Sequence, residues 1–200
     1  MRIVLATSNK GKVREIKELL HDREIFPYTD LIEGFEIVED GDTFKENALI
    51  KARAVYMALG DTDAVVVADD SGISVDVLGG APGIYSARYA GEGCSDKDNF
   101  NKLVEGVKNA GFESSSAYYT AAIAIVSKEG ESCVHGWMYG NVSIYPRGEN
   151  GFGYDPIFTP SGHTMTLGEL DSEVKVGISH RSKALHLAKI LIDQIKTQRS

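Results

Sequence analysis

The apolar run at residues 64–68, which leads directly into two aspartates, constrains the fold of this chain more than any other feature. Such an unbroken run predicts a strand that is buried on both faces, as in a sheet covered by helices on each side. We expect this strand to end at Asp69 and Asp70, which places both at the carboxyl edge of the sheet, where ligands bind in open α/β folds. Two adjacent carboxylates resist sharing negative charge unless a cation or a proton relieves them. The pair therefore predicts either a metal site or an acid–base site.

The remaining segments alternate between helix and strand patterns, which is typical of an α/β protein. Apolar residues recur at helical spacing in residues 13–20, 44–59, 96–109 and in the stretch that begins at Ser179. Extended patterns occupy residues 3–6, 73–78, 118–127, 132–139 and 141–145, with a hairpin turn at 128–131. Thr43 is the expected N-cap of the second helix, and Glu46 would complete a capping box. Together these patterns predict a mixed sheet in a single domain over residues 1–200.

Composition and net charge limit the kinds of molecule that this chain is expected to bind. The chain has 200 residues and a formal net charge of −8, which argues against a broad surface for DNA or RNA. No apolar stretch approaches the ~18 residues of a membrane span, so no membrane partner is expected. Two cysteines without CxxC spacing indicate reduced thiols, and we expect a cytoplasmic protein. A small anionic ligand stays compatible with this charge if lysines, helix N-termini or a divalent cation offset the repulsion.

The first loop joins a strand to a helix and carries hydroxyls, an amide and two lysines. It consists of Thr7, Ser8, Asn9, Lys10, Gly11 and Lys12. Free backbone N–H groups, the helix dipole and Lys12 together suit a phosphate group. The loop is not a P-loop, because Ala6 stands where that motif requires a glycine. The alternative interpretation is an ordinary capped helix with solvated lysines.

The Asp69–Asp70 pair also has two interpretations. One is a turn in which the aspartates cap the next element and Gly72 supplies a positive φ. The other is metal-assisted chemistry on a phosphate ester or anhydride, because phosphate-binding groups are expected at the same sheet edge. A magnesium ion held by Asp70 needs further oxygen ligands, and Glu39 is the candidate for a second carboxylate.

Two later segments carry residues suited to a nucleotide. The loop at 151–156 places Phe152 between glycines, which fits stacking against a base, or alternatively a tight turn whose aromatics fill the core. His180 and Arg181 open the last helix, where the dipole disfavours basic residues, and this conflict favours a functional role. Lys175 adds a positive group shortly before them.

Six segments, in order, resemble the inosine triphosphate pyrophosphatase family, also called dITP/XTP pyrophosphatases. The matching segments are residues 5–12, 44–48 with 51–52, 68–72, 80–88, 151–158 and 178–181. They extend over nearly the whole chain, and six ordered matches are far more specific than any one of them.

The resemblance implies an α/β fold with an elongated central mixed β-sheet flanked by helices, two lobes around a nucleotide-binding cleft, and a homodimer. It implies hydrolysis of ITP, dITP or XTP to the monophosphate and pyrophosphate with Mg²⁺, which removes non-standard purines from the nucleotide pool. It also implies that Asp70 is the proton acceptor and a metal ligand, that Asp69 supports it, and that Glu39 is the second metal ligand. The implied nucleotide-binding residues are Thr7, Ser8, Asn9, Lys10, Gly11 and Lys12 with Ser71 for the phosphates, Phe152, Gly153, Tyr154, Asp155 and Lys175 for the nucleotide, and His180 and Arg181 for the base.

Other functions fit part of the pattern. A pyrimidine or modified-nucleotide pyrophosphatase would share the fold, and a nucleotide-binding sensor without turnover would share the binding residues. A phosphatase of the haloacid dehalogenase type fits less well, because the DxD spacing is absent at Asp69 and Asp70.

Overall fold

The computed structural model describes residues 2–7, 9–21 and 23–199, without the side chains of Lys10 and Leu19. Its strands are β1 Arg2–Leu5, β2 Ile25–Pro27, β3 Ala64–Val75, β4 Ser114–Ser127, β5 Gly130–Ser143 and β6 Phe158–Pro160. Its α-helices are α1 Lys10–Leu19, α2 Phe44–Leu59, α3 Asp96–Asn109, α4 Ser172–Ile178 and α5 His180–Gln198. Short 3₁₀ helices are η1 Tyr28–Asp30, η2 Asp76–Leu78, η3 Gly83–Arg88 and η4 Asp155–Ile157. None of the described helices is long and apolar enough to cross a membrane.

The strands form one six-stranded sheet in the order β2-β1-β3-β4-β5-β6. β1 runs parallel to both β2 and β3, with Leu5 opposite Val67, whereas β6 runs antiparallel to β5. The sheet is therefore mixed, and the predicted α/β fold with helices flanking a mixed sheet is confirmed.

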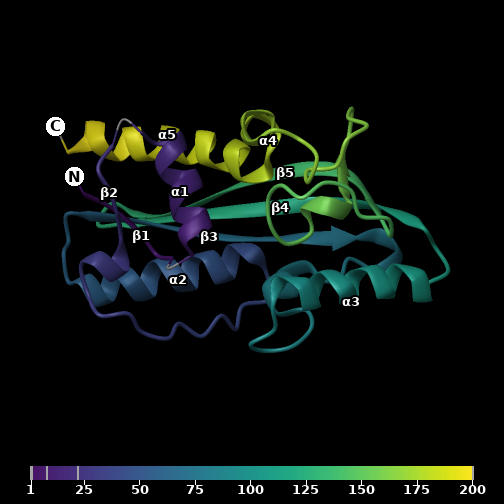
Figure 1. The fold of residues 1–200 in the computed structure, drawn as a ribbon. Helices are drawn as coiled ribbons and strands as arrows, with labels where there is room; N and C mark the ends of the chain where they lie inside the picture. The colour runs from purple at the N-terminus through teal and green to yellow at the C-terminus, as the bar shows by residue number, and fades with distance from the viewer. Residues whose placement is uncertain (1, 8, 22, 200) are drawn as a thin grey trace. The chain divides into compact units, whose positions relative to one another are not determined.

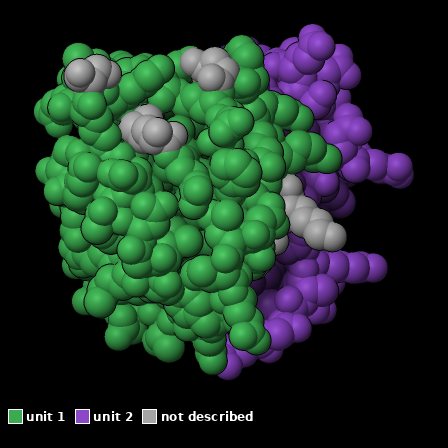
Figure 2. Space-filling model, turned by 90° about the vertical axis from the view of Figure 1, so that its left-hand side faces the viewer, with its two compact units in different colours: residues 1–70, 121–136, 181–200 green, residues 71–120, 137–180 purple. Residues whose placement is uncertain are grey.

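The chain divides into two compact units, coloured separately in Figure 2. Unit 1 contains residues 1–70, 121–136 and 181–200, and unit 2 contains residues 71–120 and 137–180. The predicted single domain over residues 1–200 stays a prediction.

Unit 1 has a helical layer on each side of its strands (Figure 1). Alternate residues of β3 divide between the two layers, because successive side chains of a strand point to opposite faces. Val65 and Val67 belong to the core cluster under α1 and α5, whereas Val66 and Ala68 belong to the cluster under α2. The unbroken apolar run thus reflects a strand buried on both faces, as predicted.

Unit 2 has its own core, to which α3, β4, β5 and the segment from Tyr154 to Leu170 contribute. Its largest fully buried side chain, Phe158, packs edge-on against Tyr119 with the ring centroids 4.9 Å apart.

The prediction that the strand ends at Asp69 and Asp70 is wrong, because β3 continues to Val75. Past the aspartates the strand packs against η3, where a Cβ on Gly72 would lie 2.4 Å from Ser86 Oγ and 2.5 Å from the backbone oxygen of Gly83. Only glycine fits this approach, and the amide of Ile73 donates to Ser86 Oγ at 2.9 Å. Gly72 therefore serves a close contact within the strand, and the alternative of a turn at Asp69–Asp70 is also wrong.

Smaller differences concern element ends. α1 begins at Lys10, three residues before the predicted start. The extended segments predicted at 132–139 and 141–145 are one strand, β5, which runs from Gly130 to Ser143. Thr43 is the N-cap of α2 as predicted, but Glu46 Oε2 accepts from the amide of Asp42 and not from that of Thr43.

Candidate active site

Asp69 and Asp70 point to opposite faces of the sheet, although they are neighbours in sequence. Asp69 continues the side of β3 that faces α1 and α5, and Asp70 continues the side that faces α2. Each carboxylate meets cations from the helices on its own face. Each carboxylate thus has its own hydrogen-bonded cation, while Lys12 and Lys51 also act electrostatically on the aspartate that they do not contact.

Asp69 is the fully buried member of an ion-pair cluster. Its Oδ2 accepts from Lys12 Nζ of α1 at 2.7 Å and from Arg181 Nε of α5 at 3.3 Å. Arg181 also pairs with Glu15 of α1 through its Nη1. Burial opposes ionisation of Asp69, but Arg181 and Lys12 outweigh it and hold the pKa of this carboxyl well below its usual range. Asp69 therefore stays an anion that fixes two cations.

Asp70 lies in a different environment. Its Oδ1 accepts from Lys51 Nζ of α2 at 2.8 Å, and the same ammonium donates to Glu39 Oε2 at 2.8 Å. Burial raises the pKa of Asp70, and the nearby Glu39 carboxylate acts in the same direction against Lys51. A carboxylate whose proton affinity is raised in this way is suited to accept a proton.

The loop that carries Glu39 is held against the start of α2. The amide of Gly41 donates to Asn47 Oδ1 at 2.9 Å, and Asn47 is fully buried. A Cβ on Gly41 would lie 2.6 Å from Glu46 Cβ, so a larger residue would displace the loop. These contacts keep Glu39 beside Lys51.

The first loop is a capped helix start, with Asn9 as the N-cap. Asn9 Oδ1 accepts from the amide of Lys12 at 3.1 Å, and the amide of Asn9 donates to Thr7 Oγ1 at 3.1 Å. A Cβ on Gly11 would lie 3.2 Å from Asn9 Oδ1. Ser8 and the side chain of Lys10 lie outside the described residues. Lys12 is directed at Asp69 rather than into solvent, so the phosphate role of the loop stays a prediction.

Unit 2 gathers a second set of predicted residues around Asp155. Asp155 Oδ2 accepts from Lys175 Nζ at 2.6 Å and from the amide of Phe152 at 2.9 Å. The Lys175 ammonium also lies 4.9 Å from the centre of the Phe152 ring, and 49% of Phe152 is exposed. Gly151, at φ 82°, allows this turn, since a Cβ there would lie 2.0 Å from Asp155 Oδ2. The result is a partly exposed aromatic face with a cation beside it.

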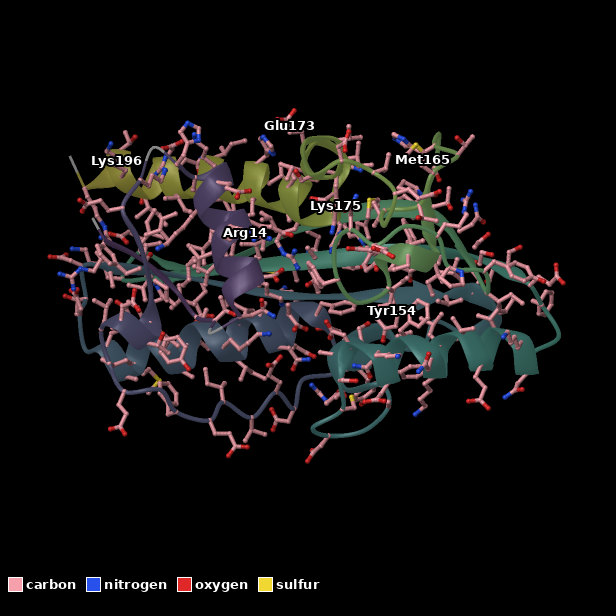
Figure 3. The ribbon with its side chains drawn as sticks, viewed as in Figure 1. Arg14, Tyr154, Met165, Glu173, Lys175 and Lys196 are labelled. Carbon is pink, nitrogen blue, oxygen red and sulfur yellow. The ribbon has the colours of Figure 1, made fainter. Side chains whose placement is uncertain are left out.

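The other predicted residues of unit 2 are more enclosed. Tyr154 is buried, and its hydroxyl donates to the backbone oxygen of Ser86 at 2.8 Å. Lys175, which is labelled with Tyr154 in Figure 3, comes from α4. His180 stacks on Tyr119 with the ring centroids 4.8 Å apart. Gly153 has φ 59°, a backbone conformation that favours glycine. Ser71, which follows Asp70 in sequence, is partly buried. Tyr154 therefore shapes the loop, and Phe152 presents its exposed ring.

Sequence reasoning gave no role to Lys51 or to Glu15. Lys51 follows Asn47 and Ala48 at helical spacing on the buried face of α2, where a lysine needs a buried anionic partner. The position of Lys51 on this face therefore indicates a buried ion pair from the sequence alone. Glu15 lies one turn after Lys12 on α1, and nothing in the sequence relates it to Arg181.

The donor set offers two carboxylates, Asp70 and Glu39, for a magnesium ion. Among the described residues, no group of three or more His, Cys, Asp or Glu is arranged to hold a metal. Asp70 Oδ2 is nevertheless buried without a hydrogen-bond partner among them, while Asp70 Oδ1 and the Glu39 carboxylate share Lys51. Magnesium is commonly held by one or two carboxylates together with substrate phosphates, so this pair is sufficient on the protein's side.

Comparison with known proteins identifies the fold family. Residues 3–190 match the model of the Ham1 family. The chain belongs to the Ham1 family. A relative from Sulfurimonas denitrificans, named dITP/XTP pyrophosphatase, is 62% identical over 98% of this chain and 100% of its own length. Another of that name from Campylobacter jejuni is 55% identical over 96% of this chain and 97% of its own.

Solved structures of Ham1 proteins share the fold. The HAM1 protein of Coxiella burnetii has a TM-score of 0.87 and 39% identity, over 97% of this chain and 99% of that one. The Ham1 protein of Staphylococcus aureus has a TM-score of 0.86 and 37% identity over the same shares. The family resemblance predicted from six sequence segments is thus confirmed across nearly the full length.

Proposed function

We propose that this Ham1 family member hydrolyses non-standard purine nucleoside triphosphates, namely ITP, dITP and XTP, to the monophosphate and pyrophosphate. The printed names of its relatives support this substrate class. The observation that carries the proposal is Asp70, a buried carboxylate of raised pKa whose second oxygen has no hydrogen-bond partner among the described residues. Such a group is suited to accept a proton from water, and Lys12 supplies a cation for the phosphates in the same proposed site.

In the proposed reaction, a water oxygen bonds to the α-phosphorus and the bond between that phosphorus and the bridging oxygen to the β-phosphate breaks. Asp70 takes the proton of the attacking water, and pyrophosphate leaves with the bonding electrons. Lys51 orients Asp70 through its bond to Oδ1. Lys12 offsets the charge of the triphosphate, which is about −4. Asp70 and Glu39 would hold Mg²⁺, which when bound polarises the phosphates and offsets their charge.

The proposed discrimination against adenine depends on the 6-position of the purine, and discrimination against guanine must use the 2-position. Hypoxanthine and xanthine carry a carbonyl oxygen there, which accepts from a donor at His180 or Arg181 or from the backbone. Adenine places an amino group at the same point and leaves that donor unpaired, at a cost of about 1–3 kcal/mol. Phe152 supplies the face against which the base stacks.

Substrate profiling tests the proposal. Purified protein with magnesium is incubated with ITP, dITP, XTP, ATP, GTP and dUTP, and nucleotide, pyrophosphate and orthophosphate products are quantified. We expect one pyrophosphate per monophosphate from the first three substrates. Release of orthophosphate with a nucleoside diphosphate as the first product would contradict the reaction, and a preference for dUTP would favour the pyrimidine alternative. Binding without turnover would favour a sensor.

We also infer a homodimer, supported by an aromatic patch made of exposed Trp137 and Tyr139 and partly buried Tyr118. Trp137 is 43% exposed and Tyr139 61% exposed, and Tyr118 packs against Tyr139 with centroids 5.8 Å apart. Exposed aromatics gathered on a sheet mark interfaces. Light scattering coupled to size exclusion should give twice the chain mass, and Trp137→Ser with Tyr139→Ser should give the monomer mass. A monomeric wild type would contradict the inference.

A cytoplasmic location belongs to the same proposal. Its support is that Cys94 and Cys133 are both free thiols, as expected where disulfides are reduced.

A further inference from the structure

A single oxygen of Asp69 serves both cations to which the proposed function gives a substrate role. Asp69 Oδ2 lies 2.7 Å from Lys12 Nζ and 3.3 Å from Arg181 Nε. No part of the Asp69 side chain is exposed. Any ligand that draws one of these cations away therefore changes how the buried carboxylate is compensated.

The two cations differ in their freedom to leave. Arg181 is 5% exposed, and its guanidinium is held at a second point by Glu15. A planar guanidinium with carboxylates at two edges is fixed in orientation. Lys12 has a flexible four-carbon stem, is 19% exposed, and donates at 3.4 Å to the backbone oxygen of Asp69 as well. Lys12 is thus the partner that can turn toward a polyphosphate.

We propose that Asp69 is a positioning residue that holds Lys12 in the ligand-free protein, and that Arg181 enables Lys12 to leave by keeping the buried carboxylate compensated. This inference rests on the proposed function, in which Lys12 binds the triphosphate. A buried carboxylate that retains one cation is tolerated, whereas one stripped of both is costly. Polyphosphate capture by Lys12 is therefore coupled to Arg181 without any contact between Arg181 and phosphate.

A double-mutant cycle read by calorimetry measures the coupling, with inorganic tripolyphosphate in magnesium buffer as the probe. Arg181→Gln should weaken tripolyphosphate binding about tenfold when Lys12 is present. In the Lys12→Met background the same substitution should change affinity less than about twofold. An equal loss in both backgrounds would show that Arg181 contacts phosphate directly, and would overturn the proposal.

A matched control separates coupling from the simple loss of a positive charge. Arg53→Gln removes a positive charge from the same unit, where Arg53 pairs with Glu131 at the surface. Its tripolyphosphate affinity should stay within about twofold of the wild type. A loss as large as that of Arg181→Gln would overturn the coupling.

Nuclear magnetic resonance of the wild-type protein keeps the proposal testable if a variant fails to fold. On addition of tripolyphosphate, the Lys12 ammonium signal should shift, and the Arg181 Nε–H signal should stay protected from exchange with water. Loss of that protection, or an unchanged Lys12 signal, would overturn the proposal.

Failure here is distinguishable from failure of the proposed function. If tripolyphosphate binds with the expected coupling but no nucleoside triphosphate yields pyrophosphate, the proposed activity is wrong and the coupling stands. If the wild type does not bind tripolyphosphate, the coupling is wrong whatever the activity.

Discussion

The two sides of β3 place the same residue type in opposite electrostatic states. On the side of α1 and α5, Asp69 meets two cations, which hold its pKa below the usual range. On the side of α2, Asp70 shares one ammonium with Glu39, and burial raises its pKa. The residues are adjacent, so the difference comes from the helices and not from the strand. Two like carboxylates can therefore take different tasks, one structural and one chemical.

The largest expected effect is on turnover when Asp70 becomes Asn. Asp70→Asn removes the proposed proton acceptor and should lower kcat by about 10²–10⁴-fold. Burial makes the ionised form of Asp70 costly, whereas its ion pair with Lys51 opposes that cost, so the free energy of unfolding should change by less than about 3 kcal/mol. Initial rates with ITP and urea unfolding check both. Full activity in Asp70→Asn would contradict the proposed role of Asp70 as the proton acceptor.

The second effect is on stability when Asp69 becomes Asn. Asp69→Asn leaves Lys12 and Arg181 without their shared anion and should lower the free energy of unfolding by about 3 kcal/mol. Asp63→Asn is the matched control, because Asp63 pairs with Lys128 at the surface of the same unit. This control should change stability by less than about 1 kcal/mol. Equal losses in the two variants would mean that burial at Asp69 does not matter.

The third effect is a smaller change with pH that has opposite signs for the two aspartates. The pKa of Asp69 is lowered by folding, so its stabilisation is present above pH ~4 and is lost as the pH falls toward its folded pKa. The stability difference between wild type and Asp69→Asn should therefore shrink from pH 6 to pH 3. The pKa of Asp70 is raised, so stability associated with its protonated form is lost as the pH rises above ~4. Urea unfolding at several pH values that gave the same slope for both variants would contradict the comparison.

The smallest effect concerns the helix that supplies Lys51. Thr43 Oγ1 accepts from the amide of Glu46 at 3.1 Å and caps α2. Thr43→Ala should lower the free energy of unfolding by about 1 kcal/mol, with Thr43→Ser retaining most of it. Denaturant unfolding compares the two variants. A serine variant as unstable as the alanine variant would exclude the capping bond as the cause.

Much of the fold followed from local patterns. The helix over 44–59 was predicted within its observed bounds, because its apolar spacing and N-cap agree. The end of β3 was not, because the close approach of Gly72 to Ser86 depends on a segment that follows later in the chain. The polar residues Asp69 and Asp70 predict a strand end, but ion pairs with distant residues allow them to be buried within the strand.

The candidate site shows the same division between local and distant information. Sequence patterns indicated Asp69, Asp70, Lys12 and Arg181 as site residues. They did not indicate that Lys12 and Arg181 both donate to Asp69 Oδ2. Lys51 stood on an apolar helical face and could have been noticed. The pairing of Glu15 with Arg181 joins residues far apart in sequence and could not.

The alternation of β3 has a consequence for which changes in chain length this protein tolerates. A one-residue insertion or deletion between Ala64 and Ala68 would turn the following residues over, so that one aspartate would meet the wrong helix and apolar neighbours would change layers. The turn between β4 and β5, at Lys128 and Glu129, has no such restriction from side-chain alternation. Among homologues, length differences should therefore gather at that turn and be absent from the strand segment before the aspartates.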